Sequence, residues 1–226
     1  MQTVAEKLDL VKETILSAER LSGRRPGSVD LIAVSKTHPA ERIREAVQAG
    51  QLLFGENRVQ EALSKIPLLP AKLRWHLIGH LQSNKVRKAL PHFELIHGVD
   101  SPDLARDIDR IAGEEGLFPK VLLEVNVSGE GTKHGFSPGD LECRIEELLG
   151  LPRLQVEGFM TMAPLAPDPE ASRPFFAMLR EFRDRMARAA GIPFSVLSMG
   201  MSGDYEVAVE EGATLVRVGS AIFGER

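Results

Sequence analysis

The sequence has very little cysteine: only Cys143 among its 226 residues. A disulfide within the chain is therefore impossible, and so is a metal cluster held by several of its thiolates. Cys143 falls in a segment with helical spacing, where a cysteine usually behaves as a small packed residue. We expect Cys143 to be packed rather than to act as a nucleophile.

The sequence also lacks an excess of positive charge. Lysine and arginine number 28 against 32 aspartates and glutamates, which gives a net charge of −4. A general nucleic-acid binder needs a basic surface that displaces counterions from phosphates, so this class is not expected. No apolar stretch approaches the length of a membrane span, and residues 1–15 lack the apolar centre of a secretory signal. We expect a cytoplasmic protein with neither a nucleic-acid nor a membrane partner.

Linkers, low-complexity tracts and short repeats are absent as well, so residues 1–226 are expected to form a single domain. Residues 2–22 predict an amphipathic helix that ends at Gly23 and Pro26. After it, short apolar runs rich in β-branched residues alternate with charged segments of helical period. The runs that we interpret as strands are 29–36, 52–57, 74–80, 95–100, 120–128, 154–162, 194–200 and 215–223.

Eight buried strands that alternate with helices favour a parallel sheet, because parallel strands need long crossovers. Eight is also the number that closes a barrel, so the expected α/β fold is a single (β/α)8 barrel with an extra N-terminal helix. An open doubly wound sheet is the alternative. Helix starts are indicated at Pro39, at Ser101 and at Ser202, whose helical segment ends at Gly212.

Lys36 stands where the first apolar run ends. In such barrels the reactive face lies at the C-terminal ends of the strands. Apolar walls favour the neutral form of an amine, and a neutral amine can attack an aldehyde. The commoner fate of a lysine at a strand end is to extend into solvent. Lys36 therefore needs support from other strands before it becomes a candidate for chemistry.

The last two strands supply that support. Small or hydroxylated residues stand at their ends, namely Gly200, Ser202, Gly219 and Ser220. At such positions backbone N–H groups can approach a phosphate, and phosphate sites after strands seven and eight recur in this fold. The alternative is that the glycines merely permit tight turns. Asp204 and Glu206 would repel an anion, so we expect both to face solvent.

Arg217 lies inside an apolar run, between two valines that must face the opposite side of the strand. Its side chain therefore points either into the barrel or towards the helices, and burial in either place demands a partner. One candidate partner is the ring nitrogen of a bound cofactor. The other is a buried carboxylate such as Glu56 or Glu124.

The histidines give weaker indications of a functional site. His76 and His80 are four residues apart, but in a strand and turn rather than on one helical face, so we expect no zinc pair. His80 could line the mouth of the barrel. Residues 82–85 are typical of a solvated helix start.

With these residues in place, the sequence resembles the family of pyridoxal phosphate (PLP) homeostasis proteins, also called the pyridoxal-phosphate-binding protein family. The matching blocks are LIAVSKTHP (31–39), FGENRVQE (54–61), WHLIGHLQSNK (75–85), EVNVSGEGTKHGF (124–136), GFMTMAP (158–164), LSMGMSGDYEVAVEEGAT (197–214) and VRVGSAIFGER (216–226). They run in order from the first strand to the last residue, which makes the resemblance specific. One departure is His38, where the family more often has lysine; it should alter the entrance more than the linkage.

The resemblance implies a barrel of the alanine racemase type, with pyridoxal 5′-phosphate held as an aldimine (a Schiff base) on Lys36. It implies that Arg217 meets the pyridine nitrogen. The phosphate is expected near Ser198, Ser202, Gly219 and Ser220. Asn57 is expected to line the pocket, and Lys133 is a candidate for a second, looser contact with PLP or for its hand-over.

The implied function is that of a carrier, which holds PLP and related B6 vitamers reversibly and supplies PLP to apo-enzymes. We expect no catalysis, because the chain lacks the second domain from which related racemases draw a second base. Arg217, which only donates hydrogen bonds, would also keep the pyridine nitrogen unprotonated and the ring a weak electron sink. The missing domain also favours a monomer. A low-activity PLP-dependent racemase or decarboxylase is one alternative, and a barrel that binds a sugar phosphate without PLP is another.

Overall fold

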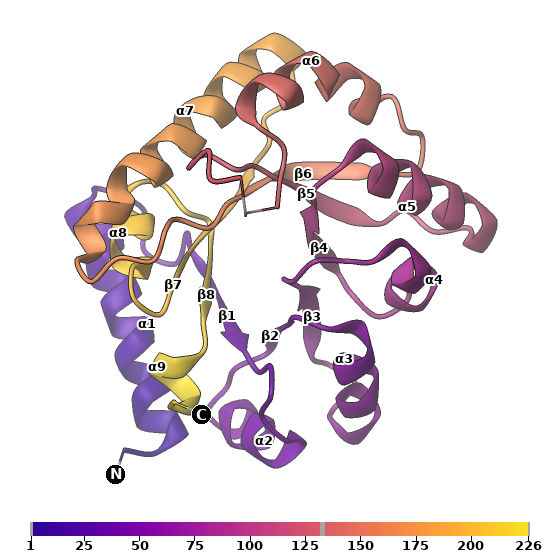
Figure 1. Cartoon of the computed structure of the whole chain (residues 1–226). Helices are drawn as coiled ribbons and strands as arrows, with labels where there is room; N and C mark the ends of the chain where they lie inside the picture. Colours follow the sequence, from indigo (N-terminus) through magenta and orange to yellow (C-terminus); the bar gives the residue numbers. More distant parts are fainter. Residues whose placement is uncertain (1, 132–133, 226) are drawn as a thin grey trace.

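The computed structural model, which describes residues 2–131 and 134–225, confirms the eight-stranded parallel barrel (Figure 1). Each strand pairs in parallel with the next, and β8 closes the ring against β1, where Arg217 lies opposite Ile32. The strands are β1 (Asp30–Val34), β2 (Leu53–Glu56), β3 (Arg74–Leu77), β4 (Leu95–Val99), β5 (Lys120–Glu124), β6 (Gln155–Met160), β7 (Val196–Met201) and β8 (Leu215–Val218).

Helices between the strands cover the outside of the barrel (Figure 1). They are α1 (Val4–Leu21), α2 (Ala40–Gln48), α3 (Val59–Lys65), α4 (Val86–Ala89), α5 (Pro102–Glu115), α6 (Pro138–Leu149), α7 (Arg173–Ala190), α8 (Tyr205–Glu210) and α9 (Ser220–Phe223). Three short 3-10 helices add η1 (Ile66–Leu68), η2 (Ser83–Lys85) and η3 (Pro169–Ser172). Within the described part of the chain, no helix has both the length and the apolar character needed to cross a membrane.

The N-terminal helix α1 is present as predicted. Thr3 and Glu6 form a reciprocal capping box at its start, which satisfies backbone N–H groups that a helix end leaves open. Its buried side chains recur every three or four residues: Val4, Leu8, Val11, Ile15 and Ala18. This stripe packs against α8 and α9, so α1 covers the side of the barrel where the ring closes.

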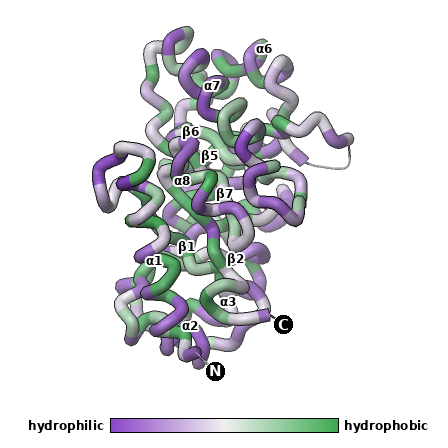
Figure 2. The backbone as a smooth tube through the Cα atoms, turned by 90° about the vertical axis from the view of Figure 1, so that its left-hand side faces the viewer, coloured by the Kyte–Doolittle hydropathy of each residue, from purple (hydrophilic) through white to green (hydrophobic). Residues whose placement is uncertain are grey.

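The interior of the barrel is filled by one apolar side chain from most of the strands, namely Ile32, Leu53, Leu95, Leu122, Met160 and Leu215. A larger apolar cluster lies between the strands and the helices. Figure 2 shows the strands as mainly hydrophobic, whereas α7 carries hydrophilic and hydrophobic residues in turn. Gly158 lets β6 approach β7 closely, because a Cβ there would lie 1.9 Å from the carbonyl oxygen of Val196.

The structure corrects several element boundaries: the expected strand 120–128, for example, ends at Glu124, and two other corrections lie beside the barrel mouth. The expected strand 215–223 ends at Val218, and residues 220–223 form the short helix α9 with Ile222 and Phe223 buried. A short apolar run has too few residues for its period to separate a strand from a buried helix. Ser202 does not begin a helix either, since α8 starts at Tyr205 and the Ser202 hydroxyl accepts the N–H of Gly219 at 3.1 Å.

The expectation that Cys143 is packed is wrong. Cys143 lies on α6 and is exposed. The buried residues of this helix are Leu141, Ile145 and Leu148, and a residue two positions after Leu141 falls on the other face.

Candidate functional site

A pocket of about 650 Å³ opens at the C-terminal ends of the strands. Its wall contains six of the seven residues that the sequence singles out: Lys36, Asn57, Ser202, Arg217, Gly219 and Ser220. These residues come from the ends of β1, β2, β7 and β8, so parallel strand order brings them to one mouth. Ser198, the seventh, does not line the pocket, and Lys133 lies outside the described residues.

Lys36 is held in place by the turn that follows β1. Its neighbour Thr37 adopts a left-handed conformation with φ of 66°, and the Thr37 N–H donates to the Glu61 carboxylate. On the other side, the buried Ser35 hydroxyl donates to Glu56 Oε1 at 2.7 Å. The residues on both sides of Lys36 are therefore tied to side chains of β2 and α3.

Lys65 completes this brace from α3. Its ammonium donates to the Ser35 carbonyl oxygen and to Glu56 Oε1, both at 2.8 Å, and to Glu61 Oε1 at 2.6 Å. Burial raises the pKa of Glu56, and the hydrogen bonds from Lys65 and Ser35 oppose that rise. Sequence reasoning proposed Glu56 as a partner for Arg217; the structure pairs it with Lys65 instead.

Arg217 points into the barrel and is 4% exposed. Its Nη1 donates to the Ser198 carbonyl oxygen at 2.9 Å and to the Ser198 hydroxyl at 2.6 Å, and its Nη2 donates to the Thr161 carbonyl oxygen at 2.9 Å. Burial lowers the pKa of Arg217 to about 10, although the charges of Glu124 and Asp204 oppose this. The guanidinium therefore stays charged near neutral pH, and its partners are neutral acceptors rather than the carboxylate that was one of the two alternatives.

These bonds leave part of the Arg217 fork available to the pocket. A guanidinium has five N–H donors, and the three bonds to Ser198 and Thr161 use three of them. Within the described residues, the other two donors have no acceptor. A buried cation in the pocket wall with spare donors can bind an acceptor atom of a ligand.

Ser198 belongs to a chain of buried polar groups rather than to the pocket wall. Its hydroxyl lies 2.9 Å from His97 Nδ1, and His97 Nε2 lies 3.0 Å from His76 Nδ1. Burial lowers the pKa of His76 to about 4 and that of His97 well below its usual value, so both rings are neutral at pH 7. This series of hydrogen-bonded polar side chains runs from Arg217 towards the N-terminal end of the barrel.

The donor order along this chain follows from Arg217. Arginine only donates, so the Ser198 oxygen accepts from it and is free to donate its proton to His97 Nδ1. His97 then donates from Nε2 to His76 Nδ1, and His76 carries its proton on Nε2. The reverse order would leave the Ser198 proton without an acceptor in the described part of the chain. The buried Nε2 of His76 has no hydrogen-bond partner among the described residues. His76 also lines a second pocket, of about 370 Å³, at the N-terminal end of the barrel.

A hydrogen bond joins the ends of β7 and β8 at the C-terminal mouth of the barrel. The Ser202 hydroxyl accepts the Gly219 N–H, which joins the two strand ends that carry the expected phosphate ligands. Asp204 was expected to face solvent, but it is half-buried in the pocket wall. Its carboxylate accepts from the Met201 N–H at 2.7 Å and from the Ser172 hydroxyl at 3.0 Å. Glu206 is exposed, as expected.

Glu124 stands at the end of β5, close to the site, and is 5% exposed. Burial and the nearby charge of Asp100 raise the pKa of Glu124 to about 7, while Arg217 and His80 oppose the rise. Sequence reasoning considered Glu124 only as an ion-pair partner for Arg217. Its inward position after an apolar strand was the signal that it would be buried and perturbed.

Comparisons with known proteins agree on one family. The profile of the family described as alanine racemase, N-terminal domain, matches residues 8–226. The pyridoxal phosphate homeostasis protein of Aquifex aeolicus is 46% identical over 222 residues, which cover 98% of this chain and 97% of that protein. The protein of the same name from Pseudomonas aeruginosa is 43% identical and covers 100% of this chain and 97% of its own length.

Solved structures extend the comparison. PipY of Synechococcus elongatus, solved with PLP bound, is 46% identical, covers 98% of this chain and 100% of its own, and superposes with a TM-score of 0.85. An alanine racemase of Clostridium difficile is 17% identical and superposes with a TM-score of 0.73 over 95% of this chain and 59% of its own. The racemase shares the barrel fold.

Proposed function

Because the chain belongs to the family of pyridoxal phosphate homeostasis proteins, we propose that it binds pyridoxal 5′-phosphate in the pocket at the C-terminal mouth, as a Schiff base with Lys36. The observation that carries the proposal is the convergence of Lys36, Arg217 and the small residues of β7 and β8 on one pocket. The relative PipY, 46% identical, was solved with PLP bound.

The residues of the pocket fit the chemical groups of this cofactor. Pyridoxal 5′-phosphate supplies an aldehyde that condenses with a primary amine, and Lys36 offers that amine in the pocket wall. The unused N–H donors of Arg217 suit an acceptor such as the pyridine nitrogen. Ser202 and Ser220 would hold the phosphate through hydroxyl and backbone N–H groups, beside Gly219, whose own N–H donates to the Ser202 hydroxyl. Asn57 would line the side of the ring.

Ser198 takes a different part in this proposal. It would orient Arg217 through two hydrogen bonds rather than touch the phosphate itself, because its side chain is fully buried in the chain of polar groups.

We propose a carrier rather than a catalyst. Arg217 stays protonated at neutral pH, so it can donate to the pyridine nitrogen but cannot accept a proton from it. An unprotonated ring withdraws electrons weakly, which disfavours reactions through a carbanion while it leaves exchange of the Schiff base possible. The names of the curated relatives describe homeostasis, and the proposed role is to store PLP and supply it to apo-enzymes, as a monomer in the cytoplasm.

The binding proposal is tested by trapping. The wild type, Lys36→Ala and the control Lys88→Ala, which changes an exposed lysine on α4, are loaded with PLP, freed of unbound cofactor and reduced with borohydride. We expect the phosphopyridoxyl mass at Lys36 in the wild type and the control, and none in Lys36→Ala. A wild type that retains no PLP, or trapping at other lysines alone, would overturn the proposal.

A second assay separates carrier from catalyst. The PLP-loaded protein is incubated with L-alanine in deuterated buffer, and in parallel with a PLP-free aminotransferase. We expect restored aminotransferase activity without deuterium incorporation into alanine. Sustained exchange or racemisation would show an enzyme.

A further inference from the structure

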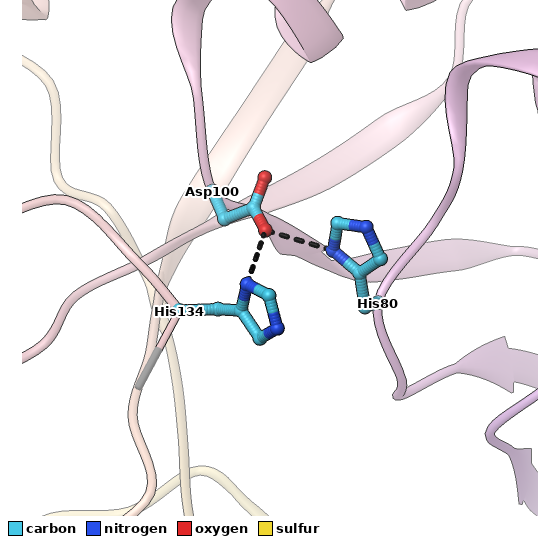
Figure 3. Close-up of side chains that lie close together, drawn as sticks. All are labelled: His80, Asp100 and His134. Atoms are coloured by element: carbon cyan, nitrogen blue, oxygen red, sulfur yellow. Dashed lines mark hydrogen bonds and ion pairs between the residues drawn. The ribbon is translucent and has the colours of Figure 1, made fainter. Parts of the chain in front are cut away.

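A cluster of two histidines and one aspartate lies on the rim of the barrel, outside the wall of the PLP pocket. His80 follows β3, Asp100 follows β4 directly, and His134 belongs to the loop between β5 and α6. Figure 3 shows both imidazole rings with a nitrogen directed at the same carboxylate oxygen. His80 Nδ1 lies 2.8 Å and His134 Nδ1 lies 3.6 Å from Asp100 Oδ2.

The spacing of these atoms matches the coordination sphere of a small tetrahedral cation. Ligand atoms about 2.0–2.1 Å from a tetrahedral ion lie about 3.3 Å from one another. The two nitrogen–oxygen distances, 2.8 and 3.6 Å, stand on either side of that value, and all three ligand atoms lie within 4.8 Å of one another. The two rings are stacked, with their centroids 4.8 Å apart and their planes 19° apart, so binding would require the exposed His134 ring to rotate until both nitrogens face one ion.

The ligand set indicates the class of ion. Two imidazoles and one carboxylate suit zinc and similar transition metals, whereas calcium and magnesium prefer oxygen ligands alone. Three protein ligands leave a fourth position for water. We propose that His80, Asp100 and His134 bind a divalent transition-metal ion, with zinc as the best match.

The surroundings supply an independent reason for a cation at this place. Glu124 is more than nine-tenths buried nearby, where the charge of Asp100 disfavours its ionised form and the charges of Arg217 and His80 favour it. Asp100 adds a second negative charge, and its ion-pair partners in the described part of the chain are the two histidines, which are cationic only when protonated. A bound dication would compensate the Asp100 carboxylate when both imidazoles are neutral.

The position of the site gives it a structural consequence. His134 is the contribution of the β5–α6 loop, while His80 and Asp100 sit at the ends of neighbouring strands. A bound ion would therefore fasten this loop to the barrel rim. None of the three ligands lines the PLP pocket, so the inference stands whether or not the proposed PLP function is correct.

Zinc titration by calorimetry tests the proposal on the full chain after chelator treatment and dialysis. Variants His134→Ala and Asp100→Asn remove ligands, His92→Ala removes an exposed histidine elsewhere, and Cys143→Ser removes the exposed thiol as a rival ligand. We expect one zinc per chain in the wild type and in both controls. Affinity should fall by at least about 10- to 100-fold in His134→Ala and Asp100→Asn, since the loss of a group that only supports a ligand already has effects of this size.

Cobalt substitution adds a spectroscopic readout. The wild type should give the intense visible absorption of tetrahedral cobalt, and His134→Ala should lose it while far-ultraviolet circular dichroism stays unchanged. An absence of stoichiometric zinc binding, or equal affinity in the wild type and His134→Ala, would overturn the inference.

Discussion

Replacing Glu124 by glutamine should stabilise the protein at pH 8 relative to pH 5. The Glu124 carboxylate is 5% exposed at the barrel mouth, and burial raises its pKa to about 7, with Asp100 adding to the rise. Ionisation at neutral pH therefore places a charge where the fold disfavours it. Glutamine has nearly the same shape and carries no charge at any pH.

The sign and size follow from linkage between protonation and folding. In the unfolded chain the carboxyl titrates near its ordinary pKa of 4.5, so between pH 4.5 and 7 the folded state binds more protons than the unfolded state. The free energy of unfolding then falls as the pH rises through this window. A pKa that moves from 4.5 to about 7 corresponds to a total change of about 3.5 kcal/mol, since each pH unit is equivalent to about 1.4 kcal/mol.

Urea titrations of the PLP-free, chelator-treated protein at about pH 5 and pH 8 measure this effect. The quantity of interest is the difference in unfolding free energy between Glu124→Gln and wild type, because that difference isolates one carboxyl from other titrating groups. It should favour the variant by about 2.5 kcal/mol more at pH 8 than at pH 5, because this window covers most but not all of the shift. Glu206→Gln, which changes an exposed glutamate, should show almost no such dependence. An equal difference at both pH values for Glu124→Gln would refute the reasoning.

Two further predictions concern the interior. Gly158→Ala should lower the free energy of unfolding by several kcal/mol or prevent folding, because its Cβ would meet the Val196 carbonyl oxygen at 1.9 Å; Gly139→Ala, with open space around it, should be neutral or slightly stabilising in thermal unfolding. Burial lowers the pKa of His76 to about 4, so the folded wild type resists protonation of this ring and loses free energy of unfolding as the pH falls from about 7 to 4. His76→Gln has no such group, so its free energy of unfolding should rise relative to that of the wild type by up to about 3 kcal/mol over this range. Urea titrations in acid check it, and a constant difference would contradict it.

The architecture was accessible from sequence because its signals are repeated. Eight apolar runs separated by helical segments leave few arrangements, since parallel strands need crossovers and connections keep one hand. The strand ends also placed Lys36 and Arg217 correctly at one mouth, because every parallel strand of a barrel ends on the same side. Periodicity sets which face of a long element is buried, and this worked for α1.

The predictions from sequence were wrong at short segments, where only a few residues determine the local structure. Residues 220–223 are too few for periodicity to distinguish a strand from a helix, so α9 was missed. Asp204 and Ser202 lie in the turn before α8, and their directions depend on which backbone N–H groups the turn leaves open. Such local hydrogen bonds compete on nearly equal terms, and a sequence pattern does not rank them.

The partners of Arg217 were hidden for a different reason. Two of its three acceptors are backbone carbonyl oxygens of Ser198 and Thr161, which any residue at those positions would present. A search by residue type finds carboxylates and overlooks such acceptors. Only the register of neighbouring strands reveals them.

This arrangement also explains why neutral histidines suit the barrel interior. A carboxylate partner would neutralise Arg217 and occupy the donors that face the pocket. Carbonyl and hydroxyl acceptors instead hold the guanidinium in place and leave its charge and two N–H groups available. His97 supports the Ser198 hydroxyl without opposing that charge, because burial and the proximity of His76 and Arg217 keep its pKa low and its ring neutral. A protonated ring at this position would repel Arg217 inside a dry core, so the polar chain fixes the cation at the mouth only while both histidines remain uncharged.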